Sequence, residues 1–372
     1  MVSESEGHVG RGTAPAVSVI VPARNEEASL GACLQSLVNQ RGVDYEIIVV
    51  DDGSTDRTRA IAHSFAGVRV TQASPLPPGA TGKCNALTCG AREAQGRWLL
   101  FTDADTVHLP GSLAASLQEA QQHHAALLSY SPQQEVRGFW EKAIMPVVFA
   151  ELTRTYRTED INDPDSPAAA ANGQYLLIAR EAYDAVGGHA AVIRTLLEDV
   201  ELARAVKRSG RRIRFRYGGD RVRARMYRSV AQLREGWTKN LALLFNEPLR
   251  LAIIRGAEFV IIVAGGAVAV TAAVRSQPAI AAVAGAAAAT MYLLFLRRIR
   301  RAHFAWDANL LALFGLPVFV SLLRASALSH KQGSVTWKGR TYGAAINSAG
   351  AGESSRFPAD ARSRDIAAPG RI

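Results

Sequence analysis

The stretches VSVIVPARNEE (17–27), EIIVVDDGSTD (46–56) and RWLLFTDAD (97–105) decide the fold, because in each a short apolar run is followed directly by polar side chains. Two further apolar runs, 68–72 and 126–130, continue the series. The segments between these runs have apolar residues at three-to-four spacing. Strands that alternate with helices form βαβ units on a mostly parallel sheet. The N-terminal third is therefore predicted to be an α/β domain with a doubly wound, mostly parallel sheet.

The middle of the chain is less regular. We expect a helix over 139–157 that Pro146 kinks, a strand within 172–179, and helices over 180–188 and 195–210. Three cysteines (Cys33, Cys84 and Cys89) without C-x-x-C spacing argue against a disulfide framework and a structural zinc site.

Residues 204–228 carry eleven Arg or Lys and one acid, Asp220, so this stretch accounts for the net charge of +10. Arginines alternate with apolar residues on both sides of Gly218-Gly219, which predicts a β-hairpin with one arginine face. That face either contacts an anionic membrane surface, at about 1 kcal/mol per basic residue, or is solvated and paired with acids. We favour the membrane contact because amphipathic and apolar segments follow. Nucleic-acid binding is not expected, since no array of aromatic residues accompanies the arginines.

Three apolar segments follow, at about 256–274, 278–296 and 308–323. About 20 apolar residues span a membrane, and the third segment is short and interrupted by Pro317. Four arginines between the second and third segments indicate a cytoplasmic loop. Basic residues after the third segment keep the tail on the same side, which makes that segment re-entrant or interfacial. The alternative is a buried helical core, against which the segment lengths and the arginine cluster argue.

These features divide the chain into five parts. The N-terminal residues are polar and include Glu4 and Glu6, so no secretory signal is expected. We therefore expect a multi-pass protein of the inner cell membrane with its α/β domain on the cytoplasmic side. The predicted parts are a disordered tail (1–15), the α/β domain (16–228), an interfacial amphipathic helix region (229–255), the membrane segments (256–328) and a basic, largely disordered tail (329–372).

Acidic residues follow two of the predicted strands, at the sheet edge where ligands bind in α/β folds. Asp51-Asp52 and Asp103-Ala104-Asp105 concentrate like charges, which is costly unless a cation or hydrogen-bond donors offset them. The D-x-D spacing suits one divalent cation, Mg²⁺ or Mn²⁺, of the kind that bridges a diphosphate. Lys83 is placed to neutralise phosphate charge. Either acidic motif alone would also fit a surface turn or a helix cap, but their joint placement favours a ligand site.

The motifs VSVIVPARNEE, EIIVVDDGSTDRT, GKCNAL, FTDAD and LEDVELARAVKRSG together resemble the inverting family 2 glycosyltransferases of the GT-A fold, over about residues 16–245. Within that family, NGQYLLIAREAYDAVGGHAAV and SHKQGSVTWKGRTY are similar to membrane enzymes that act on lipids, the hopene-associated and carotenoid (diaponeurosporenoate-type) glycosyltransferases. The resemblance implies donor-binding roles for six residues, with Asp52 at the uracil edge, and a metal-binding role for Asp105. The six donor-binding residues are Pro22, Arg24, Glu26, Asp52, Lys83 and Asp103.

The resemblance also makes Asp199 the general base. An inverting transfer needs one carboxylate to accept the acceptor's proton and a cation to stabilise the leaving diphosphate. Glu198-Asp199 opens a predicted amphipathic helix after a segment of small residues. The alternative is that both are acids favoured in the first turn of a helix.

The sequence departs from the family at the Q-x-x-R-W motif, which steadies acceptor and diphosphate in many members. Here the stretch reads QLREGWTKN (232–240), with the residue types but not the spacing. We therefore expect a single transfer rather than processive polymerisation. Candidate acceptor or diphosphate residues are Gln174, Glu198, Gln232, Arg234 and Trp237.

The expected function is transfer of one sugar, with inversion, from a nucleotide-diphosphate sugar to a lipid acceptor such as a hopanoid or carotenoid. UDP-sugars are the expected donors. One alternative is a polyprenyl-phosphate sugar synthase or polysaccharide synthase. A polyprenyl-phosphate acceptor would need a cationic pocket, for which the arginine hairpin is the candidate. Another alternative is a non-catalytic membrane scaffold that keeps the fold.

Overall fold

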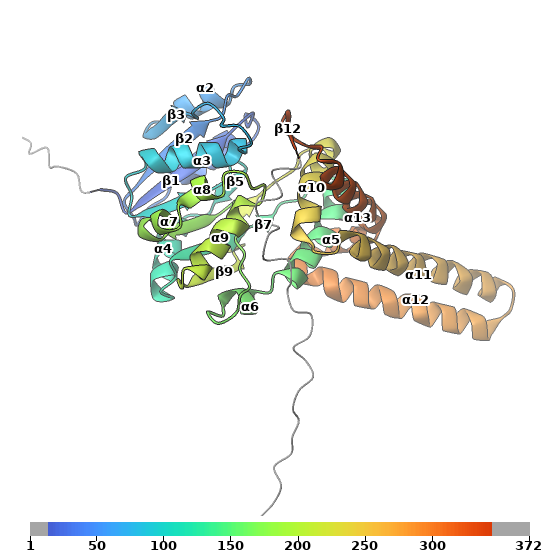
Figure 1. Cartoon of the computed structure of the whole chain (residues 1–372). Coiled ribbons are helices and arrows are strands. Elements are labelled where there is room, and N and C mark those ends of the chain that lie inside the picture. Colours follow the sequence, from blue (N-terminus) through green and yellow to red (C-terminus); the bar gives the residue numbers. More distant parts are fainter. Residues whose placement is uncertain (1–13, 344–372) are drawn as a thin grey trace, which may run out of the picture.

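The computed structural model describes residues 14–343, and its main body is a seven-stranded sheet (Figure 1). Strands β3, β2, β1 and β4 are mutually parallel, whereas β8 is antiparallel to both β4 and β6, and β9 is parallel to β6. The predicted mostly parallel sheet is confirmed. In spatial order the strands are β3 (Val68–Gln72), β2 (Tyr45–Asp51), β1 (Val17–Ala23), β4 (Trp98–Phe101), β8 (Leu176–Ala179), β6 (Leu127–Ser131) and β9 (Ile213–Tyr217).

Helices cover both faces of this sheet, as in a doubly wound fold. Side chains of a strand alternate between faces, so Val19 and Val21 contribute to one apolar core and Ile20 to the other. The first face is covered by α1 (Leu30–Val38), α2 (Thr58–His63) and α4 (Ser112–Gln122). The second face is covered by α3 (Gly82–Glu93), α7 (Arg180–Ala185) and α9 (Glu198–Arg208), with α8 (Gly188–Ala191) beside α3.

The predicted arginine hairpin is wrong, because its two strands do not pair with each other. Strand β9 extends the main sheet beside β6, while β10 (Val222–Ala224) joins a small sheet between β5 (Thr106–His108) and β7 (Gln133–Gln134). A Cβ on Gly218 would lie 2.5 Å from the Tyr130 side chain, so the chain can change sheets there only with glycine. Alternating residues reveal which side of a strand is apolar but not which strand is its partner.

Several arginines of this region are paired with acids. Arg214 and Arg216 both reach Glu119, with Arg216 Nη2 2.8 Å from Glu119 Oε2. Arg225 Nη2 lies 2.9 Å from Glu141 Oε1. These arginines are therefore paired with acids, the alternative to a membrane contact, and fewer of the positive charges remain free to contact an anionic membrane surface.

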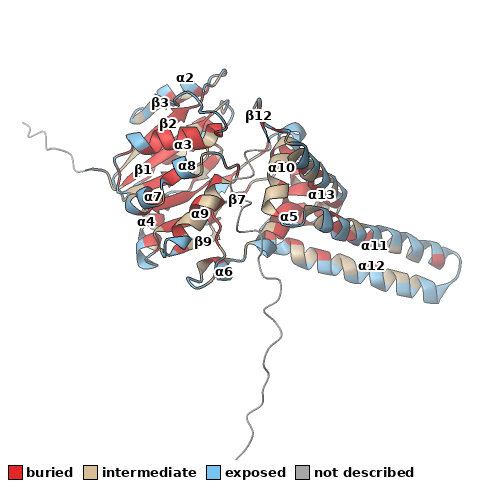
Figure 2. Cartoon of the chain, viewed as in Figure 1, coloured by how far each residue is buried: buried red, intermediate tan, exposed pale blue. Residues whose placement is uncertain are grey.

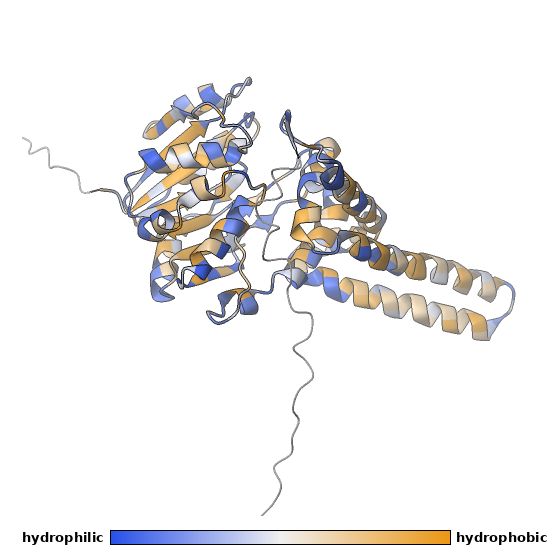
Figure 3. Ribbon diagram, in the orientation of Figure 1, coloured by the Kyte–Doolittle hydropathy of each residue, from blue (hydrophilic) through white to orange (hydrophobic). Residues whose placement is uncertain are grey.

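A helical unit packs beside the sheet domain. It consists of α5 (Phe139–Thr155), α10 (Val230–Leu244), α11 (Pro248–Val274), α12 (Pro278–Ile299), η1 (Arg300–Ala302) and α13 (Trp306–Gln332). The short helix α6 (Thr158–Asn162) leads back from α5 to the edge of β9. Figure 1 shows α11 and α12 projecting from this unit as a helical hairpin, and Figures 2 and 3 show that their exposed surfaces are largely apolar.

Within the described residues, α11, α12 extended by η1, and α13 are long and apolar enough to cross a membrane. Their environments differ. Of the most apolar window of each helix, 17% is buried in α11 and 6% in α12, against 39% in α13. Helix α13 lies beside α5 and α10, with its C-terminus near the sheet domain (Figure 1). It is therefore the most protein-covered of the three.

Two helices depart from the prediction in length. Helix α13 runs unbroken through Pro317 and is longer than the predicted segment 308–323. Close packing supports it, since a Cβ on Gly315 would lie 1.9 Å from the backbone oxygen of Ala143 in α5. The predicted amphipathic region 229–255 is divided between α10 and the first turns of α11.

The tail after α13 also differs from the prediction of disorder. It forms a hairpin of β11 (Val335–Trp337) and β12 (Arg340–Tyr342), which we call the C-terminal hairpin. The rest of the predicted C-terminal tail, 344–372, and nearly all of the N-terminal tail lie outside the described residues.

Three buried charges and one half-buried charge tie the root of the α11–α12 hairpin to α5. Glu151 of α5 lies 2.9 Å from Arg255 Nε and 3.1 Å from Arg298 Nε, and both arginines also bind Glu258. Each charge faces opposite charges, which offsets the cost of burying it. The hairpin is thus fixed to the helix that also lines the cavity described next.

Candidate active site

A cavity of about 870 Å³ opens between the carboxyl ends of the sheet strands, α5, α10 and the C-terminal hairpin. Strands β1 and β2 end level with each other, with Ala23 beside Asp51, so the polar residues that follow them are neighbours. The helical side of the cavity is mixed: Phe149, Leu152, Tyr156, Leu244 and Ala302 give it an apolar part along α5, the end of α10 and η1, whereas the rest of α10 adds the polar Gln232, Glu235, Lys239 and Asn240. The cavity therefore joins a polar side on the sheet to an apolar part of the helical unit.

The β1 and β2 ends are linked to the C-terminal hairpin by ion pairs. Arg24 Nη1 donates to the backbone oxygen of Asp52 at 2.6 Å. The Asp52 carboxylate binds the Arg340 guanidinium, and Glu26 binds the Lys338 ammonium. A Cβ on Gly82 would lie 1.8 Å from Arg340 Nη1 and 2.5 Å from Asp52 Oδ2, so a larger residue at the start of α3 would force these two side chains to move.

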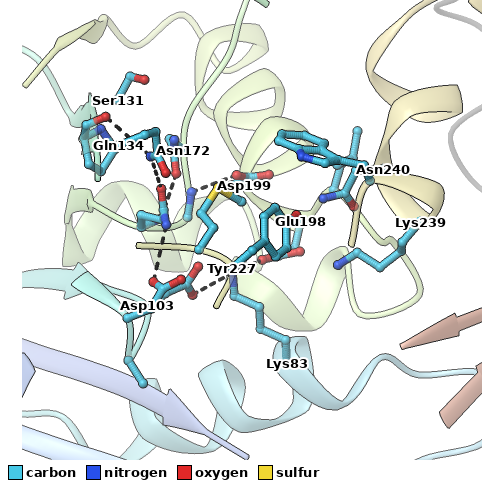
Figure 4. A pocket seen from close by; sticks show the side chains of 18 of the residues that line it. Lys83, Asp103, Ser131, Gln134, Asn172, Glu198, Asp199, Tyr227, Lys239 and Asn240 are labelled. Atoms are coloured by element: carbon cyan, nitrogen blue, oxygen red, sulfur yellow. Dashed lines mark hydrogen bonds and ion pairs between the residues drawn. The ribbon is translucent and has the colours of Figure 1, made fainter. Parts of the chain in front are cut away.

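Lys83 connects the end of β4 to the start of α9 through its ammonium. Its Nζ lies 2.8 Å from Asp103 Oδ1 and 2.8 Å from Glu198 Oε1. Burial alone would lower the pKa of Lys83, but the charges of Asp103 and Glu198 outweigh burial and raise it well above its ordinary value. Lys83 is thus held cationic in the cavity, where a phosphate could compete for it (Figure 4).

Asp105 lies in a like-charge environment. Burial, followed by the charges of Asp103 and Glu26, raises the pKa of Asp105 to about 7, while Gln174 Nε2 donates to Asp105 Oδ1 at 3.3 Å. Such a carboxylate fits a cation. The described residues hold no group of three His, Cys, Asp or Glu side chains that could enclose a metal alone. Mg²⁺ commonly takes one or two carboxylates and completes its shell with phosphate and water, so the site fits a metal shared with a diphosphate.

Asp199 stands at the first turn of α9 with both oxygens held by the backbone. Oδ2 accepts from Gly173 N at 2.7 Å, and Oδ1 accepts from Val200 N at 2.8 Å. Burial, followed by the charge of Glu198, raises the pKa of Asp199 to about 6. A carboxylate with this pKa is ionised at neutral pH and is a stronger base than an ordinary aspartate.

The cavity brings together all but one of the predicted site residues. Those that line it are Pro22, Arg24, Glu26, Asp52, Lys83, Asp103, Asp105, Gln174, Glu198, Asp199, Gln232 and Trp237. Arg234 is exposed on α10 and does not line it, because the spacing of QLREGWTKN turns this residue away.

Gln232 and Trp237 serve α10 itself in this structure. Gln232 Oε1 accepts from Arg228 N at 2.9 Å at the helix start. Trp237 is buried, with its ring centroid 5.8 Å from that of Tyr227 and 6.1 Å from that of Phe149.

Sequence reasoning missed the residues that the C-terminal segments bring to the cavity. Trp337, Lys338 and Arg340 line it. Lys239 of α10 also lines it, and it belongs to the stretch QLREGWTKN already singled out in the sequence. The available signal was the motif SHKQGSVTWKGRTY, which resembles the lipid-acting enzymes. Nothing local in that motif shows that it returns to the strand ends.

Comparison with known proteins agrees with this architecture. Residues 18–187 match the family model described as "Glycosyl transferase family 2". Residues 18–187, which hold six of the seven strands of the main sheet, are therefore similar to family 2 glycosyltransferase domains.

The curated relatives include the 4,4'-diaponeurosporenoate glycosyltransferase of Staphylococcus aureus (strain MRSA252). It is 32% identical over 232 residues, which cover 61% of this chain and 61% of the relative. The same enzyme from strain USA300 gives the same values. The alignment thus spans less than two thirds of the length of these relatives.

Two solved structures are also similar. One is the mannosyltransferase PcManGT from Pyrobaculum calidifontis in complex with GDP-Man and Mn²⁺, with a TM-score of 0.49 and 19% identity, over 85% of this chain and 87% of that one. The other is glucosyl-3-phosphoglycerate synthase from Mycobacterium tuberculosis in complex with Mn²⁺, UDP and phosphoglyceric acid, with a TM-score of 0.42 and 22% identity, over 62% and 77% of the two chains.

Proposed function

We propose that this protein is a membrane-associated inverting glycosyltransferase that transfers one sugar from a UDP-sugar to a lipid acceptor. One observation carries the proposal: a single cavity holds a cluster of acids and cations on its sheet side and an apolar part, made by α5, the end of α10 and η1, on its helical side. The sequence similarity to a diaponeurosporenoate glycosyltransferase, 32% identity over 232 residues, supports a lipid acceptor, since the name of that enzyme denotes a carotenoid acceptor.

On the donor side, Pro22, Arg24, Glu26 and Asp52 would hold the nucleoside, and Lys83 and Asp103 the ribose and phosphates. Asp105 would hold Mg²⁺ or Mn²⁺. When bound, such a metal supplies charge stabilisation for the leaving diphosphate. The like charges that raise the pKa of Asp105 support this role, because a cation would relieve them.

In the transfer step, Asp199 would accept the proton of an acceptor hydroxyl as the acceptor oxygen bonds to the anomeric carbon. The bond between that carbon and the diphosphate oxygen breaks on the opposite face, which inverts the configuration. The backbone donors Gly173 N and Val200 N hold the carboxylate in place, and preorganisation of this kind lowers the barrier.

On the acceptor side, the lipid would approach along α5, α10 and η1, next to the root of the α11–α12 hairpin. We propose that this hairpin crosses the membrane and that α13 stays on the catalytic side, since the C-terminal hairpin after α13 reaches Asp52. The arginine cluster 297–301 supports a cytoplasmic catalytic domain.

The alternatives have less support. The cationic pocket expected for a polyprenyl-phosphate acceptor was the arginine hairpin, which does not form, and two of its arginines that line the cavity, Arg216 and Arg225, are paired with Glu119 and Glu141. A non-catalytic scaffold would not need Asp199 and Lys83 in their present arrangement.

The test uses membranes that contain the expressed protein, Mg²⁺ or Mn²⁺, and a panel of radiolabelled UDP- and GDP-sugars. We expect label from one donor to enter the organic-extractable fraction, and Asp105→Asn membranes to lose it. Metal-dependent sugar release without lipid label would support the donor half and point to an acceptor missing from those membranes. Neither signal from folded protein would reject the proposed function.

A further inference from the structure

We propose that Lys239 of α10 is a phosphate-binding residue of the donor site, whose ammonium contacts the diphosphate and offsets its charge as it leaves. The inference rests on the proposed function and names a further residue of its donor site. Its ligand class is a nucleoside diphosphate.

The first argument is position. Lys239 lines the cavity on the α10 side, and Figure 4 shows its ammonium pointing toward Glu198. The charges of Glu198, Lys83 and Asp103 all act on it. It therefore faces the same interior as the cation and acid expected at the donor phosphates, but from the opposite wall.

The second argument is the lack of a counter-ion. Lys83, Lys338 and Arg340 each bind a carboxylate of the cavity. Among the described residues no carboxylate lies within ion-pair distance of the Lys239 ammonium, and burial lowers its pKa in spite of the charge of Glu198. Lys239 is half-buried, and even a partly desolvated cation is costly when it has no counter-ion. An anionic ligand would supply that partner.

The third argument is preorganisation by the C-terminal hairpin. The Lys239 ammonium lies 4.6 Å from the centre of the Trp337 ring, a cation–π contact. The Lys239 backbone oxygen accepts from His330 Nε2 of α13 at 2.7 Å. Trp337 is thus a positioning residue that holds the ammonium against the cavity wall.

The alternative cation on the same helix fails on geometry. Arg234 is exposed and does not line the cavity. The Arg234→Met variant therefore tests the inference against this alternative. If Arg234→Met lost nucleotide binding and Lys239→Met kept it, the inference would be overturned.

The experiment measures binding of UDP and of GDP, each with Mg²⁺, to the full chain in lipid nanodiscs by calorimetry. The nucleotide that binds the parent is then used for all variants. We expect Lys239→Met to weaken binding by about tenfold or more, the usual size of a lost contact between charged groups. Lys239→Arg should restore most of the affinity. Arg250→Met, which removes an exposed cation on α11, is the matched control and should bind like the parent.

Trp337→Leu provides the second measurement. If Trp337 acts by holding Lys239, it should weaken nucleotide binding in the parent and add little in the Lys239→Met background. Additive losses would contradict the positioning role.

The possible failures are distinguishable. A parent that binds neither nucleotide would reject the proposed function itself. A parent that binds one nucleotide, with Lys239→Met binding it equally well, would overturn the inference alone. Thermal unfolding of each variant identifies one that fails to fold, in which case Lys239→Arg against Lys239→Gln decides the question.

Discussion

Arg340 and Asp52 lie 288 positions apart in the sequence, yet they form a two-point ion pair, with Arg340 Nη2 3.0 Å from Asp52 Oδ1. Asp52 is the residue proposed to read the nucleobase. The C-terminal hairpin therefore covers the place that the donor base would take, and the donor and Arg340 compete for one carboxylate.

Removing this competitor should strengthen nucleotide binding. We expect Arg340→Gln to bind UDP several-fold more tightly than the parent, because Asp52 is then free, with calorimetry as the measurement. Asp52→Asn should lose binding with or without Arg340. Weaker UDP binding by Arg340→Gln would instead mean that Arg340 contacts the donor directly.

The base assignment predicts a separation of binding from transfer. Asp199→Asn should bind donor like the parent and lose about 10²-fold or more in transfer rate, the usual contribution of a general base. Glycosylated lipid and bound nucleotide are measured on the same preparation. If Asp199→Asn transferred sugar at the parent rate, Asp199 would not be the general base.

The same residue sets the expected pH dependence. The pKa of Asp199 is raised to about 6 by burial and by Glu198, and only the ionised form can accept a proton. Transfer should therefore rise with pH through a midpoint near 6 and fall below it. Glu198→Gln removes the neighbouring negative charge and should move the midpoint to lower pH. The cations Lys83 and Lys239 also interact with the Asp199 charge. A profile flat between pH 5 and 8 is the contrary result.

The metal proposal predicts that donor binding depends on both cation and Asp105. Chelation of divalent ions should abolish tight nucleotide binding by the parent. Asp105→Asn should bind weakly and respond little to added Mg²⁺ or Mn²⁺. Full metal dependence in Asp105→Asn would mean that other residues bind the metal.

The packing of α13 on α5 gives a stability prediction with an internal control. Gly315→Ala places a Cβ 1.9 Å from the Ala143 backbone oxygen and should cost about 1–3 kcal/mol, as overpacking does. Gly266→Ala in α11 meets nothing within 4 Å and should leave the midpoint of thermal unfolding unchanged or slightly raised. Equal midpoints for the two variants would argue against the close contact.

Local patterns were enough to predict the sheet domain. Strands such as β1 and β3 combine β-branched residues with flanking turns, and the carboxyl-end rule then brings Asp52 and Asp103 to one edge. Twelve of the thirteen candidate residues consequently line one cavity.

What failed depends on contacts between distant segments. Strand β10 pairs with β5 and β7, which lie much earlier in the chain. The continuity of α13 past Pro317 depends on its neighbours, α5 and α10. The places of Arg340 and Lys239 are set by a hairpin whose own sequence reads as a loose tail. No window of residues contains this information.

The position of the C-terminal hairpin in the chain has a consequence for biosynthesis. Trp337 and Arg340 are translated after the three apolar helices. If the α11–α12 hairpin crosses the membrane as proposed, the sheet domain is synthesised first, the hairpin is inserted next, and only then can the C-terminal hairpin reach Asp52. Completion of the site would therefore follow membrane insertion, and a chain that ends before residue 333 would lack the residues that cover Asp52.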